Sequence, residues 1–153
     1  MIYIPATVPI TLQTLVLFVS MFILGGKRTT VMTLVYICLG AVGAPVFSGF
    51  SGGVFRLFDA SGGFIFGFFV AAVVYWLLTL SPTASRTVKI IAALISLVSI
   101  YTVGTLWYAF VYLGGAQSLG AVLAATVLPF ILPDLVKLYV AYMISVRISY
   151  HAL

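Results

Sequence analysis

The stretch VKIIAALISLVSIYTVGTLWYAFVYL, residues 88–113, contains one charged side chain, Lys89, close to its start. A helix rises 1.5 Å per residue, so about 20 residues cross the hydrocarbon core of a bilayer. This stretch is therefore long enough and apolar enough to span a membrane. Gly114-Gly115 ends it, and Arg86 precedes it.

The composition of the whole chain agrees with this interpretation. Of its 153 residues, 64% are hydrophobic and only 6% are charged, and the mean hydropathy is +1.32. A soluble domain carries about 25% charged residues, because its surface faces water. Here most of the surface must face lipid instead. The length suits one domain, so we expect residues 1–153 to form a single transmembrane substrate-binding domain.

Working outward, Pro, Gly and polar residues divide the rest of the chain into further apolar segments. We expect Gly62 to Leu80 to be a second full-length span, and the other helices to be shorter. The fold class predicted is all-α, a polytopic transmembrane helical bundle. The remaining segments are Ile10 to Leu24, Thr30 to Val42, a short piece from Leu119 to Leu128, a break at residues 129–133, and a last helix from Asp134 to about Ile148.

The basic residues predict the orientation of the chain. If the spans alternate, five of the seven basic residues fall on one side, which the positive-inside rule makes cytoplasmic. The chain is then a multi-pass protein of the cytoplasmic membrane, and Met1 to Pro9 begins on the outer face. The five are Lys27, Arg28, Arg86, Lys89 and Arg147, whereas Arg56, Asp59, Asp134 and Lys137 fall at the outer ends.

Asp134 and Lys137 are the first candidates for a binding site. Their spacing places them on one face of the last helix, about one turn apart. Because Asp134 follows Pro133, we expect it in the first helical turn, where the helix dipole favours a carboxylate. A charge in the membrane costs about 2.5–3.5 kcal/mol, so such residues tend to be functional. A capping carboxylate with a snorkelling lysine is the alternative, and the pair alone leaves both open.

A Gly-, Phe- and Ser-rich outer stretch, residues 47–64, is the second candidate. Glycines let the backbone approach a ligand closely, and phenylalanines supply an apolar wall. Arg56 could hold a carboxylate through two parallel hydrogen bonds, or it could pair with Asp59 on the surface. An interfacial loop resting in the headgroup region is the alternative for the whole stretch. The glycines in question are Gly52, Gly53, Gly62 and Gly63, followed by Phe64.

The sequence offers little to enzymatic chemistry. It has two carboxylates and one histidine, His151, and no Walker motif, so we predict no catalytic residues, no metal site, no cofactor and no ATP hydrolysis by this chain. Its basic residues are scattered, which argues against nucleic acid as a partner. A small membrane enzyme acting on lipid headgroups stays a weaker alternative, because polar groups gather at one interface.

Five motifs occur in order along the chain, VPITLQTL (residues 8–15), YICLGAVGAPVF (36–47), FSGG (50–53), SGGFIFGF (61–68) and LPFILPDLVK (128–137). Together they resemble the BioY family, whose members are the biotin-binding substrate-specificity subunits (S components) of energy-coupling factor (ECF) transporters. The resemblance covers nearly the whole chain from Pro5 onward.

The resemblance implies a six-helix membrane fold with a biotin pocket near the outer surface. It also implies biotin uptake together with a membrane coupling subunit and ATPase subunits. Asp134 and Lys137 match the pocket residues of the family's last motif, and we add Gln13 and Tyr36 from the first two motifs. The family's first helix, which lies before the Pro-rich start, is expected to be missing here.

One motif departs from the family pattern. Residues 59–64 read DASGGF, where the family usually has Gly-Pro-Thr-Gly-Gly-Tyr. The altered loop motivates a second hypothesis of the same class, an S component for another small vitamin.

Overall fold

The computed structural model describes residues 11–81 and 83–151, and these residues form an all-helical protein, as predicted. The prediction for Met1 to Pro9 lies outside the described residues. Six α-helices are present in the described part, with a 3₁₀ turn (η1) and a π-helical turn (η2) between them. Their bounds are α1 Gln13–Leu24, α2 Gly26–Val42, η1 Val54–Leu57, α3 Gly62–Leu78, α4 Arg86–Leu106, η2 Trp107–Tyr112, α5 Leu119–Thr126 and α6 Leu128–His151.

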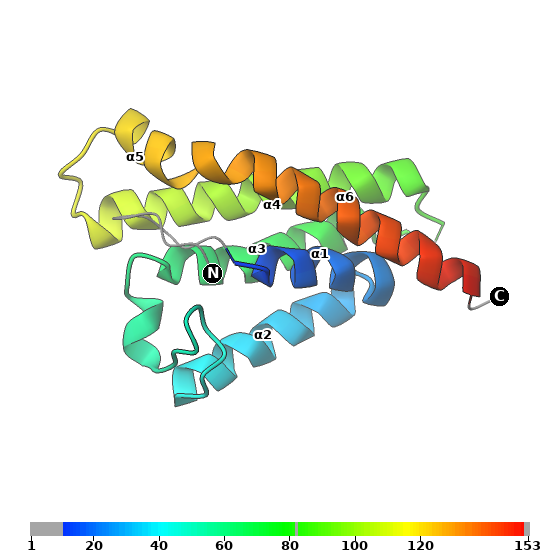
Figure 1. Ribbon diagram of the computed structural model, residues 1–153, viewed down its shortest axis with the longest axis horizontal. Coiled ribbons are helices and arrows are strands. Elements are labelled where there is room, and N and C mark those ends of the chain that lie inside the picture. The colour runs from blue at the N-terminus through cyan, green and yellow to red at the C-terminus, as the bar shows by residue number, and fades with distance from the viewer. Residues whose placement is uncertain (1–10, 82, 152–153) are drawn as a thin grey trace.

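The five longer helices run along the long axis of the molecule and reverse direction at each connection (Figure 1). α3 packs most extensively on α4, and α1 packs on α6, while α2 lies against α3 and α1. The starts of α1, α3 and α6 and the ends of α2 and α4 therefore gather at one end of the bundle, beside η1, η2 and α5 (Figure 1). We refer to this end as the loop end.

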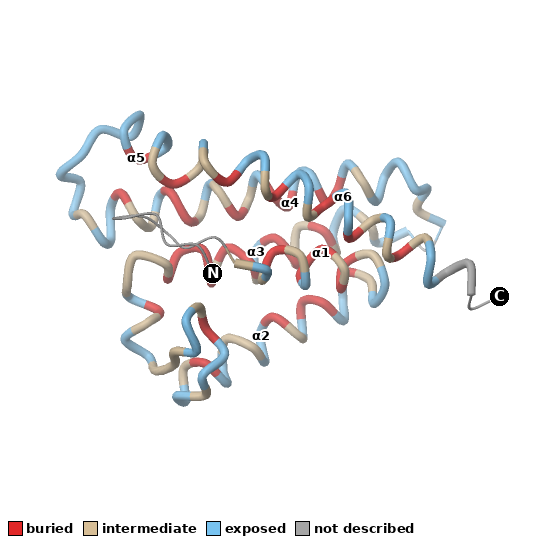
Figure 2. Tube along the Cα trace, in the orientation of Figure 1, coloured by how far each residue is buried: buried red, intermediate tan, exposed pale blue. Residues whose placement is uncertain are grey.

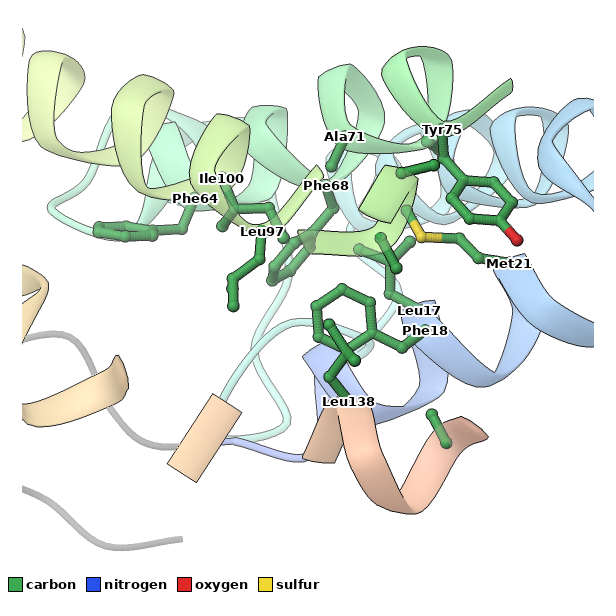
Figure 3. Packing of buried hydrophobic residues seen from close by; sticks show 14 residues of the cluster. Leu17, Phe18, Met21, Phe64, Phe68, Ala71, Tyr75, Leu97, Ile100 and Leu138 are labelled. Carbon is green, nitrogen blue, oxygen red and sulfur yellow. The ribbon is translucent and has the colours of Figure 1, made fainter. Parts of the chain in front are cut away.

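The helices meet through a core of large apolar side chains and small residues. Phe18 and Met21 of α1, Tyr75 of α3 and Ile100 of α4 are almost fully buried. Figure 3 shows these side chains converging between the helices. The outward faces carry exposed apolar residues, Leu132 at 73% and Val98 at 61% among them, and Figure 2 shows this exposure along the outer sides of α4 and α6. Such faces suit lipid rather than water.

The lengths of two helices differ from the prediction. α3 ends at Leu78 and has 17 residues, fewer than a full-length span. α6 is longer than predicted, with 24 residues. By length and composition alone, two of the described helices are long and apolar enough to cross a membrane, Arg86–Tyr112 and Leu128–Ile148.

The predicted break at residues 129–133 is wrong, because α6 begins at Leu128 and continues through Pro133. Pro129 occupies the start of the helix, where a missing N–H costs nothing. Pro133 removes one backbone hydrogen bond further along, which membrane helices tolerate. Asp134 is therefore not in the first turn of α6, and the helix dipole does not account for its position.

The connections at the end opposite the loop end differ from the prediction. Gly25 alone, with φ of 79°, separates α1 from α2, so Lys27 and Arg28 lie in the first turn of α2 rather than in a loop. Likewise Arg86 begins α4 after Ser85, whose side chain accepts a hydrogen bond from the backbone N–H of Val88. The predicted grouping of basic residues persists, because the starts of α2 and α4 and the end of α6 share the end opposite the loop end (Figure 1).

The seam between α2 and α3 leads to a first prediction. A Cβ on Gly26 would collide with the backbone and Cβ of Trp76 in α3. Gly26→Ala should therefore lower the free energy of unfolding by about 1–3 kcal/mol through overpacking. The measurement is denaturant or thermal unfolding of the purified protein in detergent.

Gly120 of α5 provides the matched control, because a Cβ there meets nothing within 4 Å. Gly120→Ala should leave stability unchanged or raise it by at most about 1 kcal/mol, the difference in helix propensity. Equal effects of the two substitutions would contradict the close α2–α3 contact.

Candidate ligand-binding site

A buried carboxylate joins three helices at the loop end. Asp134 of α6 is 4% exposed, and both of its oxygens accept hydrogen bonds. Thr14 Oγ1 of α1 donates to Oδ1 at 2.9 Å, and Tyr101 OH of α4 donates to Oδ2 at 2.9 Å. Buried polar groups in lipid must be satisfied by protein partners, and these two bonds supply them.

Lys137 completes the arrangement from one turn further along α6. Its Nζ lies 2.8 Å from Asp134 Oδ1, and the two side chains are 12% and 5% exposed. Nζ also donates to Thr14 Oγ1 at 3.1 Å. Removing one member of such a desolvated pair leaves the other charge uncompensated, which is costly. Asp134 and Lys137 therefore form a buried ion pair, and the alternative of a helix-capping carboxylate with a snorkelling lysine is wrong.

These groups form part of the wall of a cavity at the loop end, with a volume of about 50 Å³. The cavity draws on α1, α3, α4, α5, α6 and the loop after α2, and Phe68 and Ile100 join it to the apolar core (Figure 3). Its lining consists of Thr11, Gln13, Thr14, Ser48, Ser61, Phe64, Ile65, Phe68, Ile100, Tyr101, Thr126, Phe130, Asp134 and Lys137.

A second, larger and mainly apolar pocket of about 510 Å³ adjoins the first between α1 and α2. Gln13 and Phe68 line both spaces. Gln13 Nε2 donates to Tyr36 OH at 2.7 Å, and Tyr36 lines the larger pocket only. The Gln13–Tyr36 hydrogen bond therefore lies at the border between the polar cavity and the apolar pocket.

The structure brings five of the ten predicted binding residues to these two spaces. Gln13, Phe64, Asp134 and Lys137 line the polar cavity, and Tyr36 lines its neighbour. Their part in binding stays a prediction, but the structure brings them together from four of the five motifs.

Arg56 lies elsewhere, on η1. Its Nη1 contacts Asp59 Oδ2 at 3.0 Å, and the two side chains are 41% and 37% exposed. Asp59 Oδ1 also accepts a hydrogen bond from the backbone N–H of Ala60 at 2.7 Å. Of the two interpretations of Arg56, the structure shows the surface ion pair, and Arg56 is not among the described residues that line either space.

The four predicted glycines pack the loop segment against the bundle and are not among the described lining residues. A Cβ on Gly62 would collide with the carbonyl of Leu57, and one on Gly63 with the side chain of Trp107. Gly52 lies as close to the backbone of residues 43–44. Gly53 has φ of 106°, and its N–H donates to the carbonyl of Gly40 at 2.7 Å.

Sequence reasoning did not single out several residues of the site, Thr14 among them, nor the glycine that packs against Phe64. Thr14 gave no signal, since a single threonine in an apolar helix more often bonds its own backbone. The ring of Phe64 packs directly against Gly104 of α4, where a Cβ would collide with the ring. Tyr101 lines the cavity, whereas Trp107 is not among its described lining residues.

Together, the helical bundle, its lipid-compatible surface and the buried polar groups define a membrane protein with an internal polar cavity at one end. The model of the BioY family matches residues 1–152. The chain belongs to the BioY family.

Curated relatives and a solved structure agree with this assignment. The chain is 37% identical to the probable biotin transporter BioY of Pyrococcus horikoshii, over 93% of this chain and 81% of that protein. It is 35% identical to the biotin transporter BioY of Thermotoga maritima, over the same shares of the two chains. The crystal structure of the S component for biotin from an ECF-type ABC transporter superposes with a TM-score of 0.79 at 24% identity, covering 98% of this chain and 79% of that one. The likeness of the structures establishes the fold.

The position of Arg56 leads to a second prediction. Because its guanidinium pairs with Asp59 outside the cavity, Arg56→Ala should change the affinities for biotin and for biotin amide equally, by no more than about twofold. Isothermal titration of the two ligands in detergent measures this. A loss confined to biotin, which alone carries the carboxylate charge, would instead assign Arg56 to carboxylate binding.

Proposed function

We propose that this protein binds biotin with high affinity at the outer face of the cell membrane and takes part in biotin uptake as the S component of an ECF-type transporter. The observation that carries the proposal is the buried Asp134–Lys137 pair in the wall of the loop-end cavity. A membrane protein retains such a pair at a cost, and family relatives are named biotin transporters.

The pair suits one edge of a cyclic urea. A urea presents a carbonyl acceptor beside an N–H donor, and the site presents an ammonium beside a carboxylate, 2.8 Å apart. Lys137 would donate to the ureido oxygen while Asp134 accepts a ureido N–H. The apolar lining beside the pair, including Phe64, Phe68 and Phe130, would contact the sulfur-containing ring and the aliphatic chain.

Binding requires the cavity to enlarge. Pockets for small ligands measure about 300–1,000 Å³, and the polar cavity has about 50 Å³. The adjoining apolar pocket of about 510 Å³ shares Gln13 and Phe68 with it, and Gln13 is hydrogen-bonded to Tyr36. Movement of Gln13 away from Tyr36, together with Phe68, would join the two spaces.

The orientation follows from the two ends of the bundle. The end with Lys27, Arg28, Arg86 and Lys89 would face the cytoplasm, which leaves the cavity at the outer surface of a multi-pass protein of the cytoplasmic membrane. The sequence has no Walker motif, so energy would come from separate ATPase subunits through a membrane coupling subunit. In this proposal the chain is not an enzyme.

A ligand screen tests the proposal. Thermal unfolding of the purified protein should shift upward with biotin, and other small vitamins should leave it unchanged. Stabilisation by another vitamin but not by biotin would favour an S component of different specificity, the hypothesis that the altered loop at residues 59–64 motivates.

Asp134→Asn should weaken biotin binding by about 1–3 kcal/mol, because the amide cannot accept all the hydrogen bonds that the carboxylate accepts. Isothermal titration at constant pH measures the loss. Asp59→Asn is the matched control, since it alters the other aspartate of the chain at the exposed ion pair. An unchanged affinity for Asp134→Asn would leave the carboxylate with a structural role alone.

Lys137→Met should also weaken biotin binding, because the ureido oxygen loses its donor. Membrane insertion should be retained, since a charge is removed from the span. Lys89→Met, at the opposite end of the bundle, should leave affinity unchanged. Protein yield in membranes and biotin titration separate the two effects, and poorer insertion with intact binding would reverse the assignment.

A further inference from the structure

The two carboxylate oxygens of Asp134 accept different numbers of hydrogen bonds. Each oxygen has about two lone-pair sites. Oδ1 accepts from Thr14 Oγ1 and Lys137 Nζ, whereas Oδ2 accepts from Tyr101 OH, counting donors among the described residues. One acceptor site therefore remains, and it lies on Oδ2, beside Tyr101.

We infer that Thr14 and Tyr101 are positioning residues that turn a single lone pair of Asp134 toward the cavity and so select a ligand that offers one N–H there. This inference rests on the proposed function. It assigns specificity to two hydroxyl groups on α1 and α4, outside the Asp134–Lys137 motif itself.

The two hydroxyls act through Asp134 by different routes. Thr14 Oγ1 donates to Oδ1 and accepts from Lys137 Nζ, so it fixes the positions of the carboxylate and the ammonium relative to each other. Tyr101 holds Oδ2 from the opposite helix and fixes the rotation of the carboxylate plane. Without either hydroxyl, Asp134 gains an open lone pair and can turn away from the ligand.

The packing of the helices does not depend on these hydrogen bonds alone. α1 and α6 already meet through Phe18, Leu138 and Ala141 in the buried cluster, and α4 joins the same cluster through Leu97 and Ile100. Removing a hydroxyl from Thr14 or Tyr101 leaves that apolar cluster intact. Variants at the two positions should therefore fold, and the effect on ligand binding can be measured separately.

The experiment compares two substitutions with two matched controls. Tyr101→Phe and Thr14→Val should each lower biotin affinity by about 10- to 150-fold, the loss expected for a hydrogen bond to a charged group. Thr14→Ser, which keeps the hydroxyl, should restore affinity to within about twofold. The controls Tyr75→Phe and Thr30→Val remove buried hydroxyls away from the polar cavity and should not change affinity.

Ligand analogues separate positioning from a general structural effect. Two cyclic carbamates carry oxygen in place of one or the other ureido N–H of biotin. The losses caused by Tyr101→Phe and Thr14→Val should persist for the carbamate that keeps the N–H facing Asp134 and largely vanish for the other. Thermal unfolding without ligand monitors the fold of every variant.

The outcomes distinguish this inference from the function on which it rests. Wild-type binding of biotin with equal losses for all three ligands would overturn the inference and leave the proposed function standing. Unchanged biotin affinity in both Tyr101→Phe and Thr14→Val would do the same. Absence of biotin binding by the wild-type protein would overturn the proposed function and the inference together.

Discussion

The burial of one carboxylate within a membrane bundle is the constraint on which the arrangement of the loop end depends. Asp134 is 4% exposed, and an ionised group at that depth is tolerated only when it is paired and hydrogen-bonded. Thr14, Tyr101 and Lys137 meet this need from α1, α4 and α6. The requirement brings three helices together near the loop end, where the cavity lies.

The rest of the bundle separates into two halves with different chemistry. Away from the loop end, Phe18, Met21, Tyr75 and Ala71 pack between the helices (Figure 3). Towards the loop end, hydroxyl, amide and charged side chains line the cavity beside apolar ones. The apolar half supplies the stability that lets the polar half remain partly hollow, since a binding site is itself an imperfectly packed region.

Composition and motifs predicted the class of fold and part of the site, and the reasons for success and failure are physical. Apolar segments between Gly, Pro and charged residues identified the helices, because lipid admits few alternatives to helix. The two prolines of residues 129–133 led to the wrong prediction of a break, since a membrane helix accommodates Pro133, whereas a helix of a soluble protein would be interrupted there. Asp134 and Lys137 were found because charges are rare in spans, whereas Thr14 was missed because its role arises only from packing α1 on α6.

The pairing of Asp134 with Lys137 also bears on which ligands the cavity can accept. An anion would satisfy Lys137 but repel Asp134, and a cation would do the reverse, so either one leaves a desolvated charge without compensation. A neutral group with adjacent donor and acceptor atoms, on a ligand whose charge lies elsewhere, could bond to both members without separating them. In the proposed site the ion pair would therefore discriminate against a charged group at this position and in favour of an amide or urea edge. Affinity must then come largely from the apolar walls, because each polar contact replaces a hydrogen bond that the ligand already made with water.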